Sequence, residues 1–183
     1  MGTSSKELAR KLRALAARQH GCFTAAQAVD TGYADSVHLY HVKNGKWIRV
    51  FRGVYRFADA PETPAARGMA ALLWTRDKNG KIQGFLAPET AEALLSGTIP
   101  ANQPIPIRVP RDFRRSTAVP DGIEIEMAAG KSHKTSKMDG LIVHAEPMQA
   151  PKTPRQAPDV PLDMPDYYDW LDYQAVLCEK PSN

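Results

Sequence analysis

Apolar residues recur at helical spacing near the start of the chain. Leu8, Leu12 and Leu15 lie three or four residues apart, and Lys or Arg fills many of the positions between them. This pattern predicts an amphipathic helix over residues 5–19, which Gly21 ends.

Two shorter helices are expected next. Thr24 and Gln27 have the spacing of a capping box, in which a hydroxyl and an amide each bond a backbone N–H of the other residue. The second helix should therefore begin at Thr24 and end near Thr31-Gly32. A third is expected over residues 35–43, because Asn44-Gly45 tolerates the left-handed conformation that ends helices.

The period of the pattern then changes from 3.6 to 2. Residues 47–57 are rich in aromatic and β-branched side chains, and Arg52-Gly53 interrupts them as a turn or bulge. This pattern predicts a two-stranded ribbon. Three short helices followed by a basic ribbon are typical of a winged helix-turn-helix domain, which we assign to residues 1–60.

Residues 61–147 are predicted to form a small α+β domain. Thr63-Pro64 should begin one helix and Pro88 another, since proline is well tolerated in the first helical turn. Short strands are expected at residues 82–86, 105–109, 122–127 and 140–145.

Closely spaced prolines begin at Pro147 and predict a semi-extended linker. Beyond it, residues 166–177 mix aromatic and acidic side chains. We therefore assign residues 148–183 to a Pro-rich linker and an acidic aromatic tail. The predicted fold class is α+β: a winged helix-turn-helix, a small α+β domain and this tail.

Charge is distributed unevenly along the 183 residues, although the net charge is only +4. Residues 1–60 carry ten basic and four acidic side chains, whereas residues 151–183 carry three and six. A concentrated positive region favours a polyanion as partner, and an ordinary solvated surface is the alternative. The acidic tail is predicted to dock on the basic region or on a neighbouring copy; a disordered terminus is the alternative.

The third predicted helix is the candidate for reading DNA. If Leu39 and Val42 face the core, the opposite face is polar. It carries Ser36, Tyr40, Lys43 and Asn44, with His41 beside it. Asn pairs with adenine and Lys with guanine in the major groove, and Ser or Tyr can serve bases or phosphates. A merely solvated helix is the alternative.

The ribbon supplies the candidate phosphate contacts. Its basic residues are Lys46, Arg49, Arg52 and Arg56. Arg52, at the tip, is the best placed of them to reach a minor groove. For each residue taken singly, ordinary surface charge is the competing interpretation.

Signatures of enzymes and metal sites are weak. The sequence lacks a phosphate-binding loop, a nucleophile elbow and the His-Glu-x-x-His motif of metalloproteases. The possible zinc ligands do not have the spacing of a zinc finger. They are His20, Cys22, His38 and His41. We predict no enzyme activity, no metal and no cofactor.

One acidic segment, residues 121–126, resembles the start of a metal-dependent nuclease core. Such a core needs a lysine where this chain has Ala128. The favoured interpretation is a strand with Glu124 and Glu126 on its polar face. Its apolar face would be Ile123, Ile125 and Met127. A nuclease remains the weakest of three functional alternatives.

No apolar stretch is long enough to span a membrane, and the N-terminus lacks the pattern of a secretory signal. Two cysteines, Cys22 and Cys178, cannot form the disulfide framework of a small secreted protein. These features predict a cytoplasmic protein that has no membrane partner.

Two segments, residues 12–28 and 42–56, resemble the N-terminal winged-helix domain of AbiEi-family antitoxins of type IV toxin–antitoxin systems. Residues 70–74, 87–95 and 107–115 resemble the usual continuation of that family. The resemblance implies a bacterial autorepressor that binds inverted-repeat operator DNA and is paired with a nucleotidyltransferase-like toxin. A homo-oligomer on the DNA is a further hypothesis, and the sequence does not determine the oligomeric state. The competing hypothesis is a protein-interaction module that binds a toxin or another partner.

Overall fold

The computed structural model describes residues 4–128 and 133–145. They belong to one compact unit, Met1–Pro147. The predicted linker and acidic tail, and with them the expected docking of the tail, lie outside the described residues.

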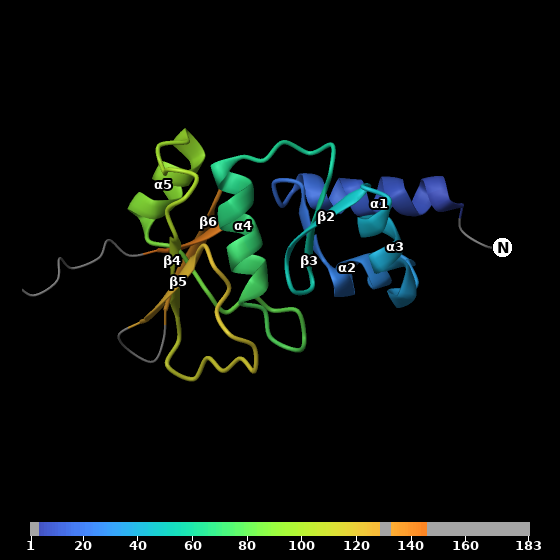
Figure 1. Ribbon diagram of the computed structural model, residues 1–183. Helices are drawn as coiled ribbons and strands as arrows, with labels where there is room; N and C mark the ends of the chain where they lie inside the picture. Colours follow the sequence, from blue (N-terminus) through green and yellow to red (C-terminus); the bar gives the residue numbers. More distant parts are fainter. Residues whose placement is uncertain (1–3, 129–132, 146–183) are drawn as a thin grey trace, which may run out of the picture. The chain divides into compact units, whose positions relative to one another are not determined.

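Three helices and a three-stranded sheet form the N-terminal part (Figure 1). The helices are α1 (Ser5–Ala17), α2 (Ala25–Asp30) and α3 (His38–Lys43), and a 3-10 turn, η1 (Asp35–Val37), leads into α3. The strands are β1 (Cys22–Thr24), β2 (Trp47–Phe51) and β3 (Val54–Phe57). The antiparallel order β1-β3-β2 gives the predicted ribbon a third strand that the sequence did not predict.

The capping box at Thr24 and the glycine that ends α1 are both found as the sequence predicts. The Thr24 hydroxyl oxygen accepts from the Gln27 backbone N–H at 3.1 Å, and the Gln27 side-chain oxygen accepts from the Thr24 N–H at 2.9 Å, so the capping box is complete. Gly21 follows α1 with a φ of +82°, a conformation that suits glycine. These two features turn the chain sharply from α1 into β1 and α2.

An aromatic cluster holds the helices against one face of the sheet. Phe23 and Trp47 meet edge to face with ring centroids 4.9 Å apart, and Tyr55 and Phe57 pack beside them. Leu12 and Ala28 bring α1 and α2 into the same cluster. The three helices therefore pack on one aromatic face of the sheet.

The register of α3 differs from the prediction. Leu39 was expected to face the core, but its side chain is 62% exposed, whereas His38 is only 4% exposed. The His38 ring lies 5.7 Å from Trp47 and 5.8 Å from Tyr55, between ring centroids. Because η1 precedes α3, His38 and Val42, four residues apart, face the sheet, and Leu39 turns outward.

Two helices and four strands form the rest of the described chain. They are α4 (Pro64–Trp74), α5 (Pro88–Ser96), β4 (Ile105–Val109), β5 (Ile123–Met127), β6 (Thr135–Met138) and β7 (Leu141–His144). Strands β4 and β5 are parallel, and β6 and β7 form an antiparallel hairpin. The strand expected at residues 82–86 is reduced to isolated bridges, by which Phe85 joins β4 and Leu86 joins β7. Strand β6 was not predicted.

The predicted inward orientation of Met127 is wrong. Its side chain is 60% exposed, whereas Ile123 at the other end of β5 is buried. The core cluster reaches Ile123 and, in part, Ile125, but it does not extend to the last residue of the strand. Glu124 and Glu126 are exposed, as expected for the polar face.

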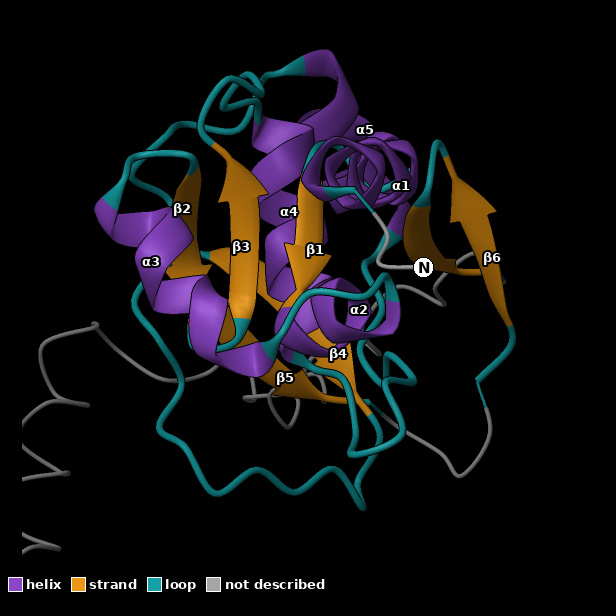
Figure 2. Cartoon of the chain, turned by 90° about the vertical axis from the view of Figure 1, so that its right-hand side faces the viewer, coloured by secondary structure: helices purple, strands orange, loops and turns teal. Residues whose placement is uncertain are grey.

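Helix α4 packs against the second face of the three-stranded sheet, opposite the aromatic cluster (Figure 2). Cys22 and Val54 are fully buried there, and the Cys22 thiol donates to the Ala66 carbonyl at 3.4 Å. Burial raises the pKa of this thiol to about 12, so it stays protonated at neutral pH. The three-stranded sheet is thus shared by two packing clusters, one on each face.

The orientation of α3 can be tested with a pair of leucines. Leu12→Ala should lower the free energy of unfolding by about 2–5 kcal/mol, because it opens a cavity beneath α1. The matched variant Leu39→Ala should change it by less than about 0.5 kcal/mol. Urea unfolding followed by circular dichroism measures both. Equal losses would contradict the outward orientation of Leu39.

Candidate nucleic-acid interface

The exposed face of η1 and α3 carries the residues expected to read DNA. Ser36, Tyr40, Lys43 and Asn44 are all exposed, and Tyr40 is 60% exposed. Leu39 joins this face because of the register described above. The face therefore combines one cation, an amide, two hydroxyls and an apolar side chain, a mixture suited to the edges of base pairs.

His41 has a different environment from these residues. Its ring stacks on Trp47 at 4.5 Å between centroids and meets Tyr33 edge to face at 5.4 Å. Within the described chain its Nδ1 is buried without a hydrogen-bond partner. Burial, and secondarily the charges of Lys46 and His38, lower the pKa of this imidazole. His41 thus packs α3 onto the sheet as a neutral ring.

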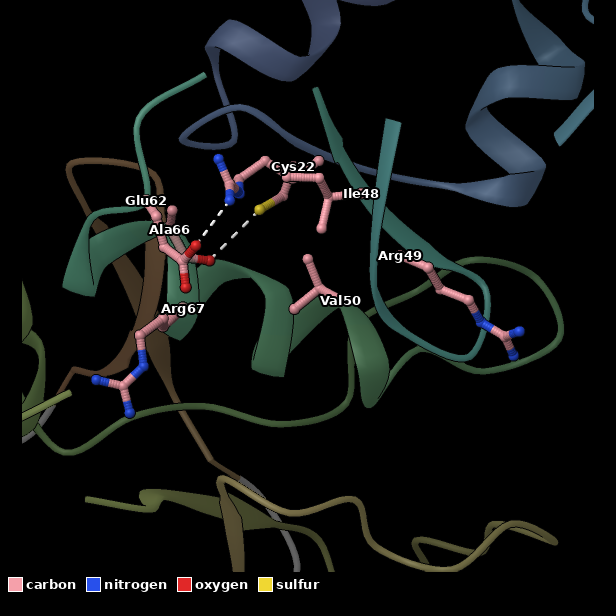
Figure 3. A pocket seen from close by; sticks show the side chains of 8 residues that line it. Cys22, Ile48, Arg49, Val50, Glu62, Ala66 and Arg67 are labelled. Carbon is pink, nitrogen blue, oxygen red and sulfur yellow. Dashed lines mark hydrogen bonds and ion pairs between the residues drawn. The ribbon is translucent and has the colours of Figure 1, made fainter. Parts of the chain in front are cut away.

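Three of the four predicted ribbon cations are exposed: Lys46, Arg49 and Arg52. Arg49 pairs with Tyr55 across the strands, and Tyr55 packs against His38 of α3. Because side chains alternate between the faces of a sheet, Arg49 belongs to the face that carries α3. Arg49 contributes to the lining of the hollow beside α4, but Figure 3 shows its side chain extending away from Cys22.

Arg56 is the exception, and its expected phosphate contact does not fit its position. It is 5% exposed and lies on the sheet face turned toward α4, one residue after Tyr55. Its guanidinium donates to the Glu62 carboxylate at 2.8 Å and to the Ala60 carbonyl. It lines a hollow of about 260 Å³ with Cys22 and other residues (Figure 3). Arg56 thus joins the sheet to the segment that leads into α4.

We call eight of the exposed residues of these two elements the α3–ribbon surface; Asp35 of η1 and Ile48 of β2 are also exposed and are not counted in it. Its members are Ser36, Leu39, Tyr40, Lys43, Asn44, Lys46, Arg49 and Arg52. Seven of them were candidates from the sequence. Leu39 was missed, and the signal that could have found it is the pair His38 and Val42, whose spacing of four also fits an inward helix face.

Two of the four residues considered as metal ligands, His20 and Cys22, have other hydrogen-bond partners. Among the described residues, no group of three or more His, Cys, Asp or Glu side chains could hold a metal ion. The His20 ring lies 2.7 Å from the Asp139 carbonyl, and Cys22 is buried against α4. Glu126, from the nuclease-like segment, pairs with Arg108 at 3.0 Å. The geometry therefore offers no support for a zinc site or a nuclease centre in the described part.

In the part of the chain that the structure describes, no helix has the length and apolar character to cross a membrane.

A protein-family model matches part of the chain. Residues 10–58 match the family model described as "Transcriptional regulator, AbiEi antitoxin". The matched segment runs from α1 through the end of β3, so it contains the whole α3–ribbon surface and about a quarter of the 183 residues. It confirms the resemblance inferred from the sequence for this segment. No curated protein has a sequence that matches the chain.

The buried position of Arg56 and the exposed position of Arg49 predict different effects on stability when each residue is replaced. Arg56→Gln should lower the free energy of unfolding by about 1–3 kcal/mol, because buried hydrogen bonds to a charged group are lost. Arg49→Gln removes the same charge from an exposed position and should change it by less than about 0.5 kcal/mol. Urea titrations of both variants test this. A larger loss for Arg49→Gln would contradict the assignment.

A second prediction concerns pH. Because the folded-state pKa of His41 lies below its usual value, the unfolded chain takes up a proton first as pH falls below about 6.5. The His41 contribution to stability is therefore present above that pH and is lost below it. His41→Phe keeps a ring on Trp47 and should lose less stability between pH 7.5 and 5.5 than the wild type. An equal or larger loss in urea titrations at the two pH values would refute this.

Proposed function

We propose, from the premise that residues 10–58 belong to the AbiEi antitoxin family of transcriptional regulators, that this chain binds operator DNA and represses its own promoter. The observation that carries the proposal is the α3–ribbon surface. It places a hydrogen-bonding helix face next to exposed cations of the ribbon. This combination suits a duplex, where cations hold phosphates and a helix reads base edges.

In this proposal α3 lies in the major groove. Asn44 bonds adenine and Lys43 bonds guanine, while Ser36 and Tyr40 bond bases or nearby phosphates. Leu39 contacts the methyl group of thymine, the apolar feature of that groove. Lys46, Arg49 and Arg52 bind phosphates of the flanking backbone, with Arg52 at the tip of the ribbon.

The aromatic packing of α3 supports this role. His38 and His41 pack against Trp47 and hold one face of α3 on the sheet. A helix whose buried face is fixed by aromatic packing presents its exposed side chains in a defined orientation. Less conformational freedom is then lost on binding, which favours affinity for one base sequence.

An operator made of inverted repeats requires two copies of the chain related by a two-fold axis. We propose that the chain binds as a homo-oligomer, with each α3 in one half-site. The half-sites would be about 10 base pairs apart, or a multiple of that, so that both helices reach the same side of the duplex.

The antitoxin part of the proposal concerns a second partner. We propose that the chain is paired functionally with a nucleotidyltransferase-like toxin. The support is the family match of residues 10–58. An adjoining gene for such a toxin would agree with this pairing, and its absence would leave a repressor without a toxin.

A second candidate function, a protein-interaction module, is favoured by one observation. Leu39 and Tyr40 expose an apolar and an aromatic side chain side by side on α3. Such a pair also suits a protein partner, since aromatic residues are enriched in protein interfaces. The two functions differ in their dependence on salt, which is steep for phosphate contacts.

The experiment compares two duplexes of equal length by fluorescence anisotropy. One comes from the region upstream of this chain's reading frame, and the other from within the frame. The upstream duplex should bind at least about 10³-fold more tightly, a ratio typical of specific recognition. Asn44→Ala should reduce that preference by about 10-fold or more, the cost of losing a base contact.

Asn79→Ala is the matched control, because Asn79 is exposed in a turn outside the α3–ribbon surface. It should leave the preference unchanged. Equal affinity of the wild type for both duplexes would overturn operator recognition, and equal effects of the two asparagine variants would overturn base reading by α3.

A further inference from the structure

Three arginines from distant parts of the sequence lie near the tip of the ribbon: Arg52 in the turn, Arg76 just after α4, and Arg115 in the loop after β4. We propose that Arg52 and Arg115 together bind one phosphate group of the DNA backbone and that Arg76 positions the ribbon tip for this contact. The inference rests on the proposed function and extends the DNA interface beyond residues 10–58.

Arg76 fixes the ribbon tip to the end of α4. Its Nη2 donates to the Gly53 carbonyl at 2.9 Å, and its Nη1 donates to the Leu73 carbonyl at the same distance. The Gly53 carbonyl also accepts from the Ala25 N–H at 3.0 Å. A Cβ atom at Gly53 would lie 2.6 Å from Arg76 Nη2, at the end of a flexible side chain, and the φ of +72° also favours glycine at this position. The adjacent residue, Arg52, is thereby held at a defined place.

Arg115 is held beside Arg76 with donors to spare. Its Nη1 donates to the Arg76 carbonyl at 2.9 Å, and its Cζ lies 4.6 Å from the centre of the Trp74 ring. The stacking on Trp74 fixes the plane of the guanidinium. Within the described chain, its buried Nε has no hydrogen-bond partner. A guanidinium fixed in this way is suited to bind an oxyanion through the donors of its η nitrogens, since its Nε is buried.

The charge of this cluster is not compensated by a direct ion pair. Among the described residues, none of the three arginines has a carboxylate within 4.0 Å. Asp77, which lines a shallow hollow together with Arg76, accepts instead from the backbone N–H groups of Asn79 and Lys81. Asp30 and Asp35 line the same hollow.

The arginines also disfavour one another's charge. Burial lowers the pKa of Arg76 and of Arg115. The charge of Arg115 adds to this effect at Arg76, and the charge of Arg52 adds to it at Arg115. An anion between Arg52 and Arg115 would relieve this repulsion, and phosphate has the oxygen geometry that guanidinium groups bind.

The position favours a phosphate of DNA over a free one. Arg52 lies on the same ribbon as Arg49, whose side chain belongs to the sheet face that carries α3. A duplex seated on α3 would therefore extend along the ribbon toward Arg52. Free phosphate shares the same chemistry, so the experiment includes an arm for each source.

The test measures the affinity for the duplex at salt concentrations from about 50 to about 300 mM, a range over which the screening of charges changes strongly. Four proteins are compared: the wild type, Arg52→Gln, Arg115→Gln and the double variant. Each single variant should flatten the slope of log affinity against log salt by up to about one unit. If both arginines bind the same phosphate, the slope of the double variant should be flatter than that of the wild type by about one unit in total, not two. Its loss of affinity should also be smaller than the product of the two single losses.

Two further variants keep the test decisive. Lys137→Gln removes one charge from an exposed position on β6 and should leave the slope unchanged. Arg115→Lys keeps the charge and should keep most of the slope, which a purely structural role for Arg115 would not predict. If Arg115→Gln does not fold, the salt slopes of Arg115→Lys and Arg52→Gln can still be compared with that of the wild type.

The outcomes separate this inference from the proposed function. Suppose that Arg115→Gln keeps the salt slope of the wild type, while Asn44→Ala loses the preference for the upstream duplex. This result would overturn the shared phosphate site and leave operator binding intact. Wild-type protein that prefers no duplex overturns the proposed function itself. Thermal stabilisation by inorganic phosphate that Arg52→Gln abolishes, with an unchanged salt slope, overturns the DNA assignment in favour of a free anion.

Discussion

Packing on both faces of one short sheet is the constraint on which the rest of the described structure depends. Strands β1, β3 and β2 carry α1, α2 and α3 on the face of Trp47 and Tyr55, and α4 on the face of Cys22 and Val54. Strands of three to five residues make few hydrogen bonds, so burial of both faces supplies much of their stability. The orientation of α3 and the position of the ribbon tip both follow from this arrangement.

This constraint explains which parts of the fold the sequence predicts. Helices α1, α2, α4 and α5 depend on local periodicity and on caps such as Thr24, and their predicted positions are confirmed. Strands β1 and β6 have three and four residues, too few for a period of their own, and they exist because distant segments pair with them. Local sequence carries no signal for such pairing.

The residues of the candidate interface also differ in whether the sequence predicts them. Seven exposed residues were predicted from helical spacing and from charge. Arg56 and Leu39 were misplaced, because alternation in β3 does not reveal that the face of Arg56 is the one covered by α4, and because η1 shifts the register of α3. Arg76 and Arg115 gave no signal, since only the folded chain brings them to the ribbon tip.

The distribution of charge implies that α3 and the ribbon have different roles in the proposed interface. The exposed face of α3 carries one permanent cation, Lys43, which is too little to provide the electrostatic part of DNA affinity. We propose that the exposed ribbon cations supply that part, and Arg76 holds the tip of the ribbon to the end of α4. In the proposed complex α3 would select the sequence, and the ribbon would hold the backbone at a place set by the rest of the molecule. Residues beyond the AbiEi-like segment would thus contribute to DNA binding by positioning as well as by direct contact.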